Sequence, residues 1–359
     1  MDSKWPQIKG TLLLRARGEG EEKKALQIAA EILQEGGRVA FPTETVYGLG
    51  ASALDPEAVR GIFRAKRRPP DNPLIVHVAD LEQAGELTKN IPPAAARLAE
   101  HFWPGPLTLI LPKKETVPAI ITAGLPSVAV RVPAHFLALK LLRTAGLPLA
   151  APSANLSGRP SPTTAEHVLE DLAGRIEAVL DGGPCPIGVE STVVSFLFSP
   201  PALLRPGGVT LERLEEVLGA KIQDPGSGRY AMDANEAPPA PGMKYRHYAP
   251  QAPLFLVEGA GPAQSRRLLA LCTSLAAQGR KIGLIVFAES QGIFQAPVCR
   301  VLSSRRDPVT AAARLYGILR EMDAAGVDAI VVEGFETAGM GGAVMNRLRK
   351  AATKVIGAE

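Results

Sequence analysis

Cationic side chains gather just before a rigid turn in the first third of the chain. The segment AKRRPPDNPLIVHV, residues 65–78, places Lys66, Arg67 and Arg68 at the end of a predicted helix. A helix C-terminus favours cations through its dipole, and that alone would explain an isolated basic triplet. Here the proline-rich turn of residues 69–73 follows directly and would hold the cations in place. A rigid turn of this kind would have no use on a solvated face, so the triplet is a candidate for a positioned functional site.

Hydroxyl and amide side chains are concentrated in loops next to predicted strands. The segments are FPTETVYGLG (41–50, with Thr43, Glu44, Thr45 and Tyr47), APSANLSGRPSPT (151–163, with Ser153, Asn155, Ser157 and Ser161), GVESTVV (188–194, with Ser191 and Thr192) and LLRPGG (203–208, with Arg205). Each has an ordinary structural explanation. The second, for example, could simply cap a helix that begins near Thr164. Taken singly, none of them establishes a function.

Several familiar chemical motifs are missing from the sequence. It contains no Gly-x-x-x-x-Gly-Lys-Ser/Thr loop, no Gly-x-Gly-x-x-Gly after a strand, no His-Glu-x-x-His and no Gly-x-Ser-x-Gly. Nucleotide chemistry would therefore need another architecture. The three cysteines, Cys185, Cys272 and Cys299, are far apart and form no Cys-x-x-Cys pair. This spacing argues against a disulfide framework and against a structural zinc site.

The first 220 residues alternate strand-like and helix-like stretches, which predicts an α/β domain. Helices are expected at about 23–34 and at 56–65, the latter opening after Asp55 as N-cap with Pro56 in its first turn. Strands are expected at 39–41, 74–78, 107–111, 128–132 and 191–196. Because many short strands are joined by proline-rich turns, we predict a twisted mixed sheet rather than a parallel one.

A second, smaller domain is predicted after a linker. Residues 222–252 are rich in Pro, Gly and Ala and show no periodicity, whereas 253–359 alternate strands (254–257, 282–287, 329–332) with helices (263–277, 309–322). This rhythm predicts a small Rossmann-like domain. The linker also contains the aromatic and cationic run 243–248. We expect this run to fold back over the site of the first domain, residues 1–221, with Tyr245 contacting a nucleotide.

Charge and hydropathy narrow the classes of protein. The formal net charge is +4 at pH 7, and the first 220 residues are nearly balanced, so charge alone does not indicate a nucleic-acid binder. No segment reaches the roughly 18 uninterrupted apolar residues of a membrane span. The N-terminal MDSKWPQIKG lacks an apolar signal core. We therefore expect a cytoplasmic protein with no membrane partner.

Together, these segments resemble the YrdC/YciO-type threonylcarbamoyl-adenylate synthases. The family's Lys-x-Arg and Ser-x-Asn elements correspond here to Lys66-Arg67-Arg68 and Ser153-Ala154-Asn155. Its long two-domain form has a linker similar to PGMKYRHYAP, residues 241–250, and a second domain that ends much like MNRLRKA, residues 345–351. The resemblance covers nearly the whole chain, apart from the extreme N-terminus and residues 222–238.

The resemblance implies an enzyme that makes threonylcarbamoyl-AMP and pyrophosphate from L-threonine, bicarbonate or CO2, and ATP, with Mg²⁺ bound through ATP rather than by a dedicated protein site. Lys66, Arg68, Ser153 and Asn155 would be catalytic. ATP would contact these four together with Asn72, Ser127, Ser161, Arg205 and Tyr245. Threonine would contact Thr45, His77, Arg131, the Ala151 backbone and Ser191, with Arg131 gripping the carboxylate. Without the resemblance, His77 on an apolar strand would be read as a core histidine.

By the same analogy, the product would pass to the enzyme complex that modifies the adenosine beside the tRNA anticodon, with a weak direct tRNA contact as a further expectation. Two other functions remain open at this point. One is a non-catalytic RNA-binding module, although the near-neutral first domain speaks against it. The other is the carbamoyl-transfer module of hydrogenase maturation proteins, which carries zinc-finger-like cysteine pairs that this sequence lacks.

Overall fold

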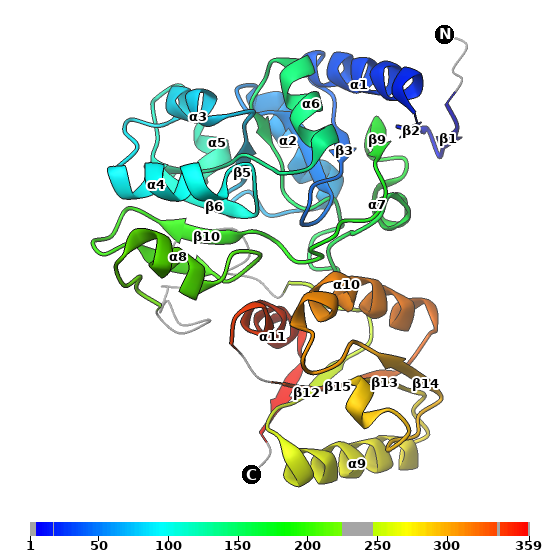
Figure 1. The fold of residues 1–359 in the computed structure, drawn as a ribbon. Helices are drawn as coiled ribbons and strands as arrows, with labels where there is room; N and C mark the ends of the chain where they lie inside the picture. The colour runs from blue at the N-terminus through cyan, green and yellow to red at the C-terminus, as the bar shows by residue number, and fades with distance from the viewer. Residues whose placement is uncertain (1–4, 17, 225–246, 336–337, 358–359) are drawn as a thin grey trace. The chain divides into compact units, whose positions relative to one another are not determined.

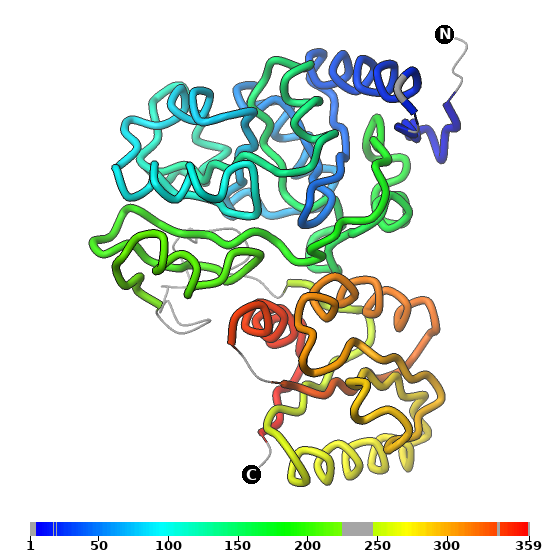
Figure 2. Tube along the Cα trace, viewed as in Figure 1, coloured from blue at the N-terminus to red at the C-terminus, as the bar shows by residue number. Residues whose placement is uncertain are grey.

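The chain forms two compact units, shown in Figures 1 and 2. The computed structural model describes residues 5–16, 18–224, 247–335 and 338–357. The first unit comprises Met1–Ser157, Ser161–Pro186 and Glu190–Lys244, and the second comprises Gly158–Pro160, Ile187–Val189 and Tyr245–Glu359. Most of the predicted linker, including Tyr245, lies outside the described residues, so its expected contact with the nucleotide stays a prediction.

An 11-stranded mixed sheet forms the centre of the first unit, as the sequence predicted. The strand order is β1-β2-β9-β3-β4-β8-β5-β7-β6-β10-β11. The strands are β1 (Gln7–Ile8), β2 (Thr11–Arg15), β3 (Val39–Phe41), β4 (Gly48–Ser52), β5 (Ile75–His77), β6 (Leu107–Pro112), β7 (Ser127–Arg131), β8 (Leu149–Ala150), β9 (Ala178–Asp181), β10 (Thr192–Ser195) and β11 (Ala202–Arg205). Strand β5 runs parallel to β7, whereas β6 and β7 are antiparallel.

Eight helices accompany this sheet within the described residues: α1 (Glu19–Gln34), α2 (Pro56–Lys66), α3 (Leu81–Leu87), α4 (Pro93–Phe102), α5 (Ala119–Thr122), α6 (Phe136–Ala145), α7 (Ala165–Leu172) and α8 (Leu211–Leu218). Helix α2 shows how local sequence sets their limits. Asp55 caps its N-terminus by accepting from the Glu57 N–H, and Pro56 occupies the first turn. The helix ends at Arg67, which is left-handed (φ 51°). This end fixes Lys66 on the last turn.

The central strands present different side chains on their two faces because side chains alternate along a strand. Val76, Val128 and Val130 point into the main hydrophobic core of the unit. Ile75 and Ala129 belong to a separate small apolar cluster on the other face. His77 and Arg131, two positions further along β5 and β7, share that second face. This face of the sheet therefore carries His77 and Arg131 next to the small apolar cluster that contains Ile75 and Ala129.

The second unit contains a five-stranded sheet in which every strand pair is parallel, in agreement with the predicted Rossmann-like domain. The order is β14-β13-β15-β12-β16. The strands are β12 (Leu254–Val257), β13 (Ile282–Val286), β14 (Val298–Val301), β15 (Ala329–Glu333) and β16 (Lys354–Ile356), and the helices are α9 (Gly261–Ala277), the short 3-10 helix η1 (Ala288–Ser290), α10 (Pro308–Ala324) and α11 (Met340–Ala351). Figure 1 shows α10 and α11 on one face of this sheet and α9 on the other.

No helix among the described residues is long and apolar enough to cross a membrane.

Candidate active site

The predicted site residues on β5 and β7 lie at the two ends of one parallel strand pair. His77 is directly opposite Arg131 at the carboxyl ends of these strands. Ser127 begins β7 at the other end, beyond the Ile75–Ala129 pair. Four residue steps along a strand span roughly 13 Å. The predicted threonine contacts therefore occupy one end of the pair, and a predicted ATP contact occupies the other.

Arg131 is held by three groups from two loops: Gly105, and the neighbours Glu44 and Thr45. Its Nε donates to the Gly105 carbonyl (3.2 Å), and its Nη1 donates to Thr45 Oγ1 (3.0 Å). Its Nη2 lies 2.6 Å from Glu44 Oε1 in a buried ion pair. Gly105 is required here because a Cβ would lie 2.1 Å from the Phe102 carbonyl oxygen. The sequence analysis placed Thr45 at this site but gave no role to Glu44 or Gly105.

His77 is a neutral imidazole inside the site. Burial, and then the positive charge of Arg131, lowers the pKa of His77 to about 3. A hydrogen bond with the Ile75 backbone opposes this shift. The Nδ1 atom of His77 has no hydrogen-bond partner within the described part of the chain. A buried polar atom without a partner is costly, which makes His77 Nδ1 a candidate for contact with a ligand.

Ser191 and Arg205 are in direct contact, although the sequence analysis placed them on different substrates. Arg205 Nε donates to the Ser191 carbonyl (3.0 Å), and Arg205 Nη2 donates to Ser191 Oγ (3.1 Å). The same hydroxyl is 2.7 Å from Thr108 Oγ1, a residue that the sequence analysis missed. All three side chains are buried. This cluster joins the residue before β10 to β6 and β11.

Lys66 is hydrogen-bonded to the backbone of the Ser-x-Asn loop, residues 153–155. Its ammonium donates to the carbonyls of Ser153 (2.5 Å) and Asn155 (2.6 Å), and Ser153 Oγ donates to Asn155 Oδ1 (2.6 Å). Burial, then the nearby Arg68 charge, lowers the pKa of Lys66, while Asp171 opposes this shift. Two of the three ammonium donors thus hold backbone carbonyls of this loop. The structure brings together Lys66, Ser153 and Asn155 as the sequence analysis expected.

Arg68 and Asn72 are joined through the proline-rich turn. Arg68 Nη2 donates to the carbonyls of Asn72 (3.3 Å) and Pro73 (3.1 Å). Asn72 is completely buried, yet neither atom of its side-chain amide has a partner among the described residues. An amide buried in this way is costly unless a ligand satisfies it.

The remaining predicted contacts lie in the neighbouring loops. Ser161 Oγ donates to Glu190 Oε1 (2.6 Å), and both residues are buried. The Ala151 N–H donates to the Ile75 carbonyl (2.9 Å). Ser127 is buried at the start of β7.

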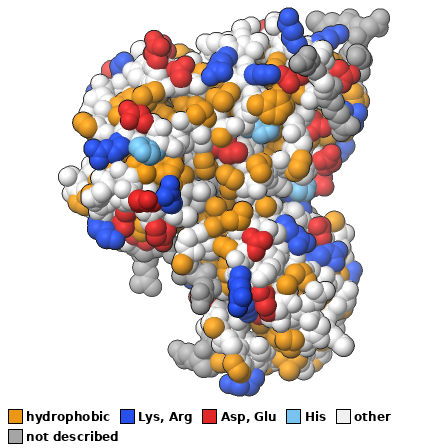
Figure 3. Space-filling view, in the orientation of Figure 1, with side chains coloured by type: hydrophobic (Ala, Val, Ile, Leu, Met, Phe, Trp, Pro, Cys, Tyr) orange, Lys and Arg blue, Asp and Glu red, His pale blue; other side chains and the backbone are white. Residues whose placement is uncertain are grey.

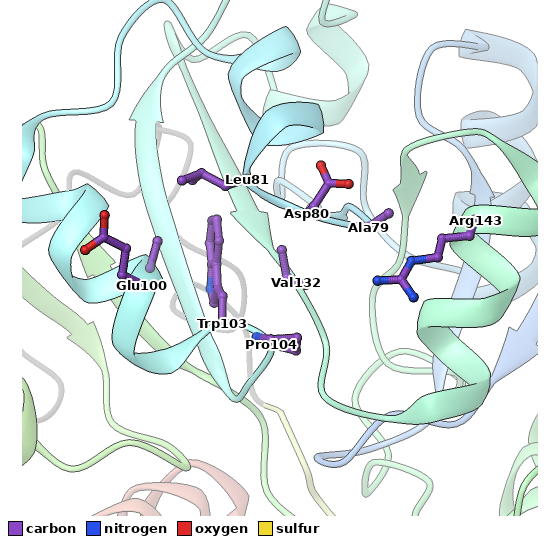
Figure 4. A pocket seen from close by; sticks show the side chains of 9 residues that line it. Ala79, Asp80, Leu81, Glu100, Trp103, Pro104, Val132 and Arg143 are labelled. Atoms are coloured by element: carbon purple, nitrogen blue, oxygen red, sulfur yellow. The ribbon is translucent and has the colours of Figure 1, made fainter.

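A cavity of about 350 Å³ opens next to this site. Figure 4 shows its lining, in which the Trp103 ring stands on one side and the Arg143 guanidinium on the other. Val132, the residue after Arg131, and Pro104, the residue before Gly105, also line it. None of the predicted substrate-binding residues is part of its wall, so the cavity is a neighbour of the site and not the site itself.

Side chains of the second unit make polar contacts with one another and with the backbone at the carboxyl ends of its strands. Open α/β sheets bind ligands beyond the carboxyl ends of their strands. There, Gln264 Nε2 donates both to the Val257 carbonyl (2.9 Å) at the end of β12 and to the Gly334 carbonyl (2.7 Å) after β15. Buried Glu333 accepts from Ser290 Oγ (2.7 Å) and pairs with Arg305. These contacts favour the first unit as the place of the nucleotide chemistry.

Comparison with known proteins identifies the family of the chain. The Sua5/YciO/YrdC family model, described as "Telomere recombination", matches residues 31–207. A model for the "Threonylcarbamoyl-AMP synthase, C-terminal domain" matches residues 209–353. Threonylcarbamoyl-AMP synthase of Pyrococcus abyssi is 51% identical over 341 residues, covering 95% of this chain and 97% of the relative. The enzyme of the same name from Bacillus subtilis is 51% identical over 325 residues, covering 90% and 92%.

Solved structures give the same result. Pyrococcus abyssi Sua5 complexed with L-threonine matches with a TM-score of 0.89 at 49% identity, covering 97% of this chain and 99% of that one. Escherichia coli YciO, at 23% identity and a TM-score of 0.50, covers 55% of this chain and shares the fold of the first unit. The chain therefore belongs to the two-domain Sua5 family of threonylcarbamoyl-AMP synthases.

Proposed function

We propose that the chain makes threonylcarbamoyl-AMP and pyrophosphate from L-threonine, bicarbonate and ATP. Two relatives that match over nearly the whole chain at 51% identity are named for this activity. One observation in the structure carries the proposal. Two buried polar groups, one just before β5 and one at its end, have no hydrogen-bond partner among the described residues. These groups are the Asn72 amide and His77 Nδ1.

The threonine half of the site is assigned to the carboxyl ends of β5 and β7. Arg131 would hold the substrate carboxylate through charge-assisted hydrogen bonds. Thr43 Oγ1 donates its single proton to the Val46 carbonyl (2.6 Å), so in its 2.8 Å contact with Thr45 the proton comes from Thr45. Thr45 Oγ1 can thus only accept a further hydrogen bond. This suits it to the ammonium or hydroxyl of threonine rather than to the carboxylate. His77 Nδ1 and Ser191 complete this half.

The ATP half is assigned to the cations and amides around the Ser-x-Asn loop. Lys66 and Arg68 would offset phosphate charge, and Asn72 would direct its free amide to the nucleotide. Ser127, Ser153, Asn155 and Ser161 line the same half. Arg205 contacts Ser191, so we place it where the two substrates meet.

The reaction needs positioned substrates more than a reactive side chain. The threonine amine would form a C–N bond to bicarbonate, with loss of water, or to CO2. An oxygen of the resulting carbamate would attack the α-phosphorus of ATP, and the bond to pyrophosphate would break. Holding the two anionic partners together and offsetting their developing charge supplies the catalysis. This accords with a sequence that carries no nucleophile motif.

Magnesium would enter with ATP as part of that substrate. Among the described residues, no group of three or more His, Cys, Asp or Glu side chains could hold a metal ion. We also propose a cytoplasmic location and transfer of the product to a tRNA-modifying complex.

On the face seen in Figure 3, cationic and anionic side chains are interspersed over both units. This distribution does not favour the alternative of a non-catalytic RNA-binding module.

A substrate-omission assay tests the proposal. Pyrophosphate release from ATP should require both threonine and bicarbonate. Release that continues unchanged without threonine would indicate a plain ATP pyrophosphatase, and absence of release under all conditions would favour a binding module.

A further inference from the structure

Glu44 lies beside Arg131, the residue proposed to hold the threonine carboxylate, but is not itself one of the proposed substrate contacts. It sits in the loop between β3 and β4, next to Thr45, and its side chain is only 9% exposed. One carboxylate oxygen, Oε1, pairs with Arg131 Nη2 at 2.6 Å. The other, Oε2, accepts from the Ala134 backbone N–H at 3.0 Å. Glu44 therefore links Arg131 to the turn that leaves β7.

Each of the three guanidinium nitrogens of Arg131 has one contact, and the contact of Nη2 with Glu44 is an ion pair without hydrogen-bond geometry. Nε is held by Gly105 and Nη1 by Thr45. Glu44 supplies the only anionic contact to Arg131 among the described residues. A guanidinium has five N–H donors, so these three contacts leave donors for a substrate carboxylate. Because the side chain of Arg131 is only 4% exposed, its charge needs a partner when no substrate is bound.

From this geometry, and resting on the proposed function, we propose that Glu44 is a positioning residue for threonine recognition. It holds Arg131 in the orientation that receives the substrate carboxylate and compensates the buried charge of Arg131 in the free enzyme. It acts through Arg131 and touches neither substrate. Two alternatives predict different results when Glu44 is replaced. If Glu44 competes with threonine for Arg131, its replacement should strengthen threonine binding. If the ion pair is purely structural, its replacement should leave threonine binding unchanged.

The test is steady-state kinetics of Glu44→Gln. The amide keeps the shape of the side chain, but only its carbonyl oxygen can accept, so it cannot serve both Arg131 and the Ala134 N–H as the two carboxylate oxygens do. We expect the threonine KM to rise about tenfold, as for loss of one charge-assisted contact. The ATP KM and kcat should stay within about twofold of the parent values. An unchanged threonine KM would overturn the proposal, and a lowered one would show that Glu44 competes with threonine.

A double-mutant cycle with Arg131→Lys separates positioning from a general loss of structure. If Glu44 acts through Arg131, adding Glu44→Gln to Arg131→Lys should change the threonine KM by less than about twofold. Fully additive effects would contradict this. Should Glu44→Gln fail to fold, Glu44→Asp takes its place, because it keeps the charge but is too short to reach both partners.

The control is Glu177→Gln, in a more exposed ion pair of the same unit. Glu177 pairs with Arg38 and accepts from the Arg38 N–H at 2.7 Å, in the same unit but without contact to a proposed site residue. It should lower stability without raising the threonine KM. If the parent enzyme shows no threonine-dependent pyrophosphate release, the proposed function fails. If the parent is active and Glu44→Gln matches it, only the present inference fails.

Discussion

His77 lies opposite Arg131 across the parallel strands β5 and β7, and the charge of Arg131 adds to burial in lowering the pKa of His77 to about 3. The imidazole therefore stays neutral in the folded enzyme at any pH where the enzyme is expected to work. In the unfolded chain, a histidine has a pKa of about 6.5. This difference links the stability of the first unit to pH.

The direction of that linkage follows from proton binding. Below about pH 6.5 the unfolded chain binds a proton at His77 that the folded chain does not, so stability falls as the pH falls towards 3. Each pH unit in this window should cost about 1.4 kcal/mol from this group. Urea denaturation at about pH 7 and about pH 5 should show the parent losing about 2 kcal/mol more than His77→Gln. Equal losses in the two proteins would refute the assignment.

The cation pair gives a second prediction. Lys66→Ala and Arg68→Ala should each lower turnover on the order of a hundredfold, as when a preorganised charge contact is lost. Lys66→Ala should also loosen the Ser153–Asn155 loop, since two carbonyls lose their donor. Arg67→Ala is the matched control, because Arg67 lies between them but is exposed. Pyrophosphate release measured for all three variants decides the matter: near-normal rates for Lys66→Ala and Arg68→Ala would exclude the assignment.

Gly207 permits a close backbone approach beneath Ser191. A Cβ at Gly207 would lie 2.3 Å from the Glu190 carbonyl oxygen and 2.4 Å from the Ser191 carbonyl carbon. Gly207→Ala should therefore displace Ser191, raise the threonine KM and cost about 1–3 kcal/mol of stability. Gly85→Ala is the control, because its Cβ meets open space within α3 and should stabilise by roughly 0.5–1 kcal/mol. Thermal melting and threonine titration compare the pair, and identical behaviour would contradict the strain argument.

The sequence predicted best those helices and strands whose ends are marked by local signals, such as an N-cap residue or a proline. Helix α2 begins where Asp55 and Pro56 indicated, and β12 has the predicted residues 254–257. Short strands without such signals were missed, among them β8, which has two residues, and β16. Their conformation depends on pairing with distant strands, which periodicity within the chain does not reveal.

The site divides in the same way. The resemblance to a known family supplied Arg131, His77 and Ser191, of which His77 and Ser191 lie in the quoted segments 65–78 and 188–194 and Arg131 lies in the predicted strand 128–132. It did not supply Glu44 or Thr108, whose roles arise from contacts made between separate loops and strands. Glu44 stands within FPTETVYGLG, but its letter alone does not show that it faces Arg131. Only the folded chain shows which side chains support the ligand contacts.

The central claim is that this chain joins threonine, bicarbonate and ATP into one adenylate. Mass spectrometry of the product formed from ¹³C-labelled bicarbonate, L-threonine and ATP tests it directly. The account predicts threonylcarbamoyl-AMP that carries one labelled carbon, together with an equal amount of pyrophosphate. ATP cleaved to AMP and pyrophosphate with no label in any nucleotide product would contradict it.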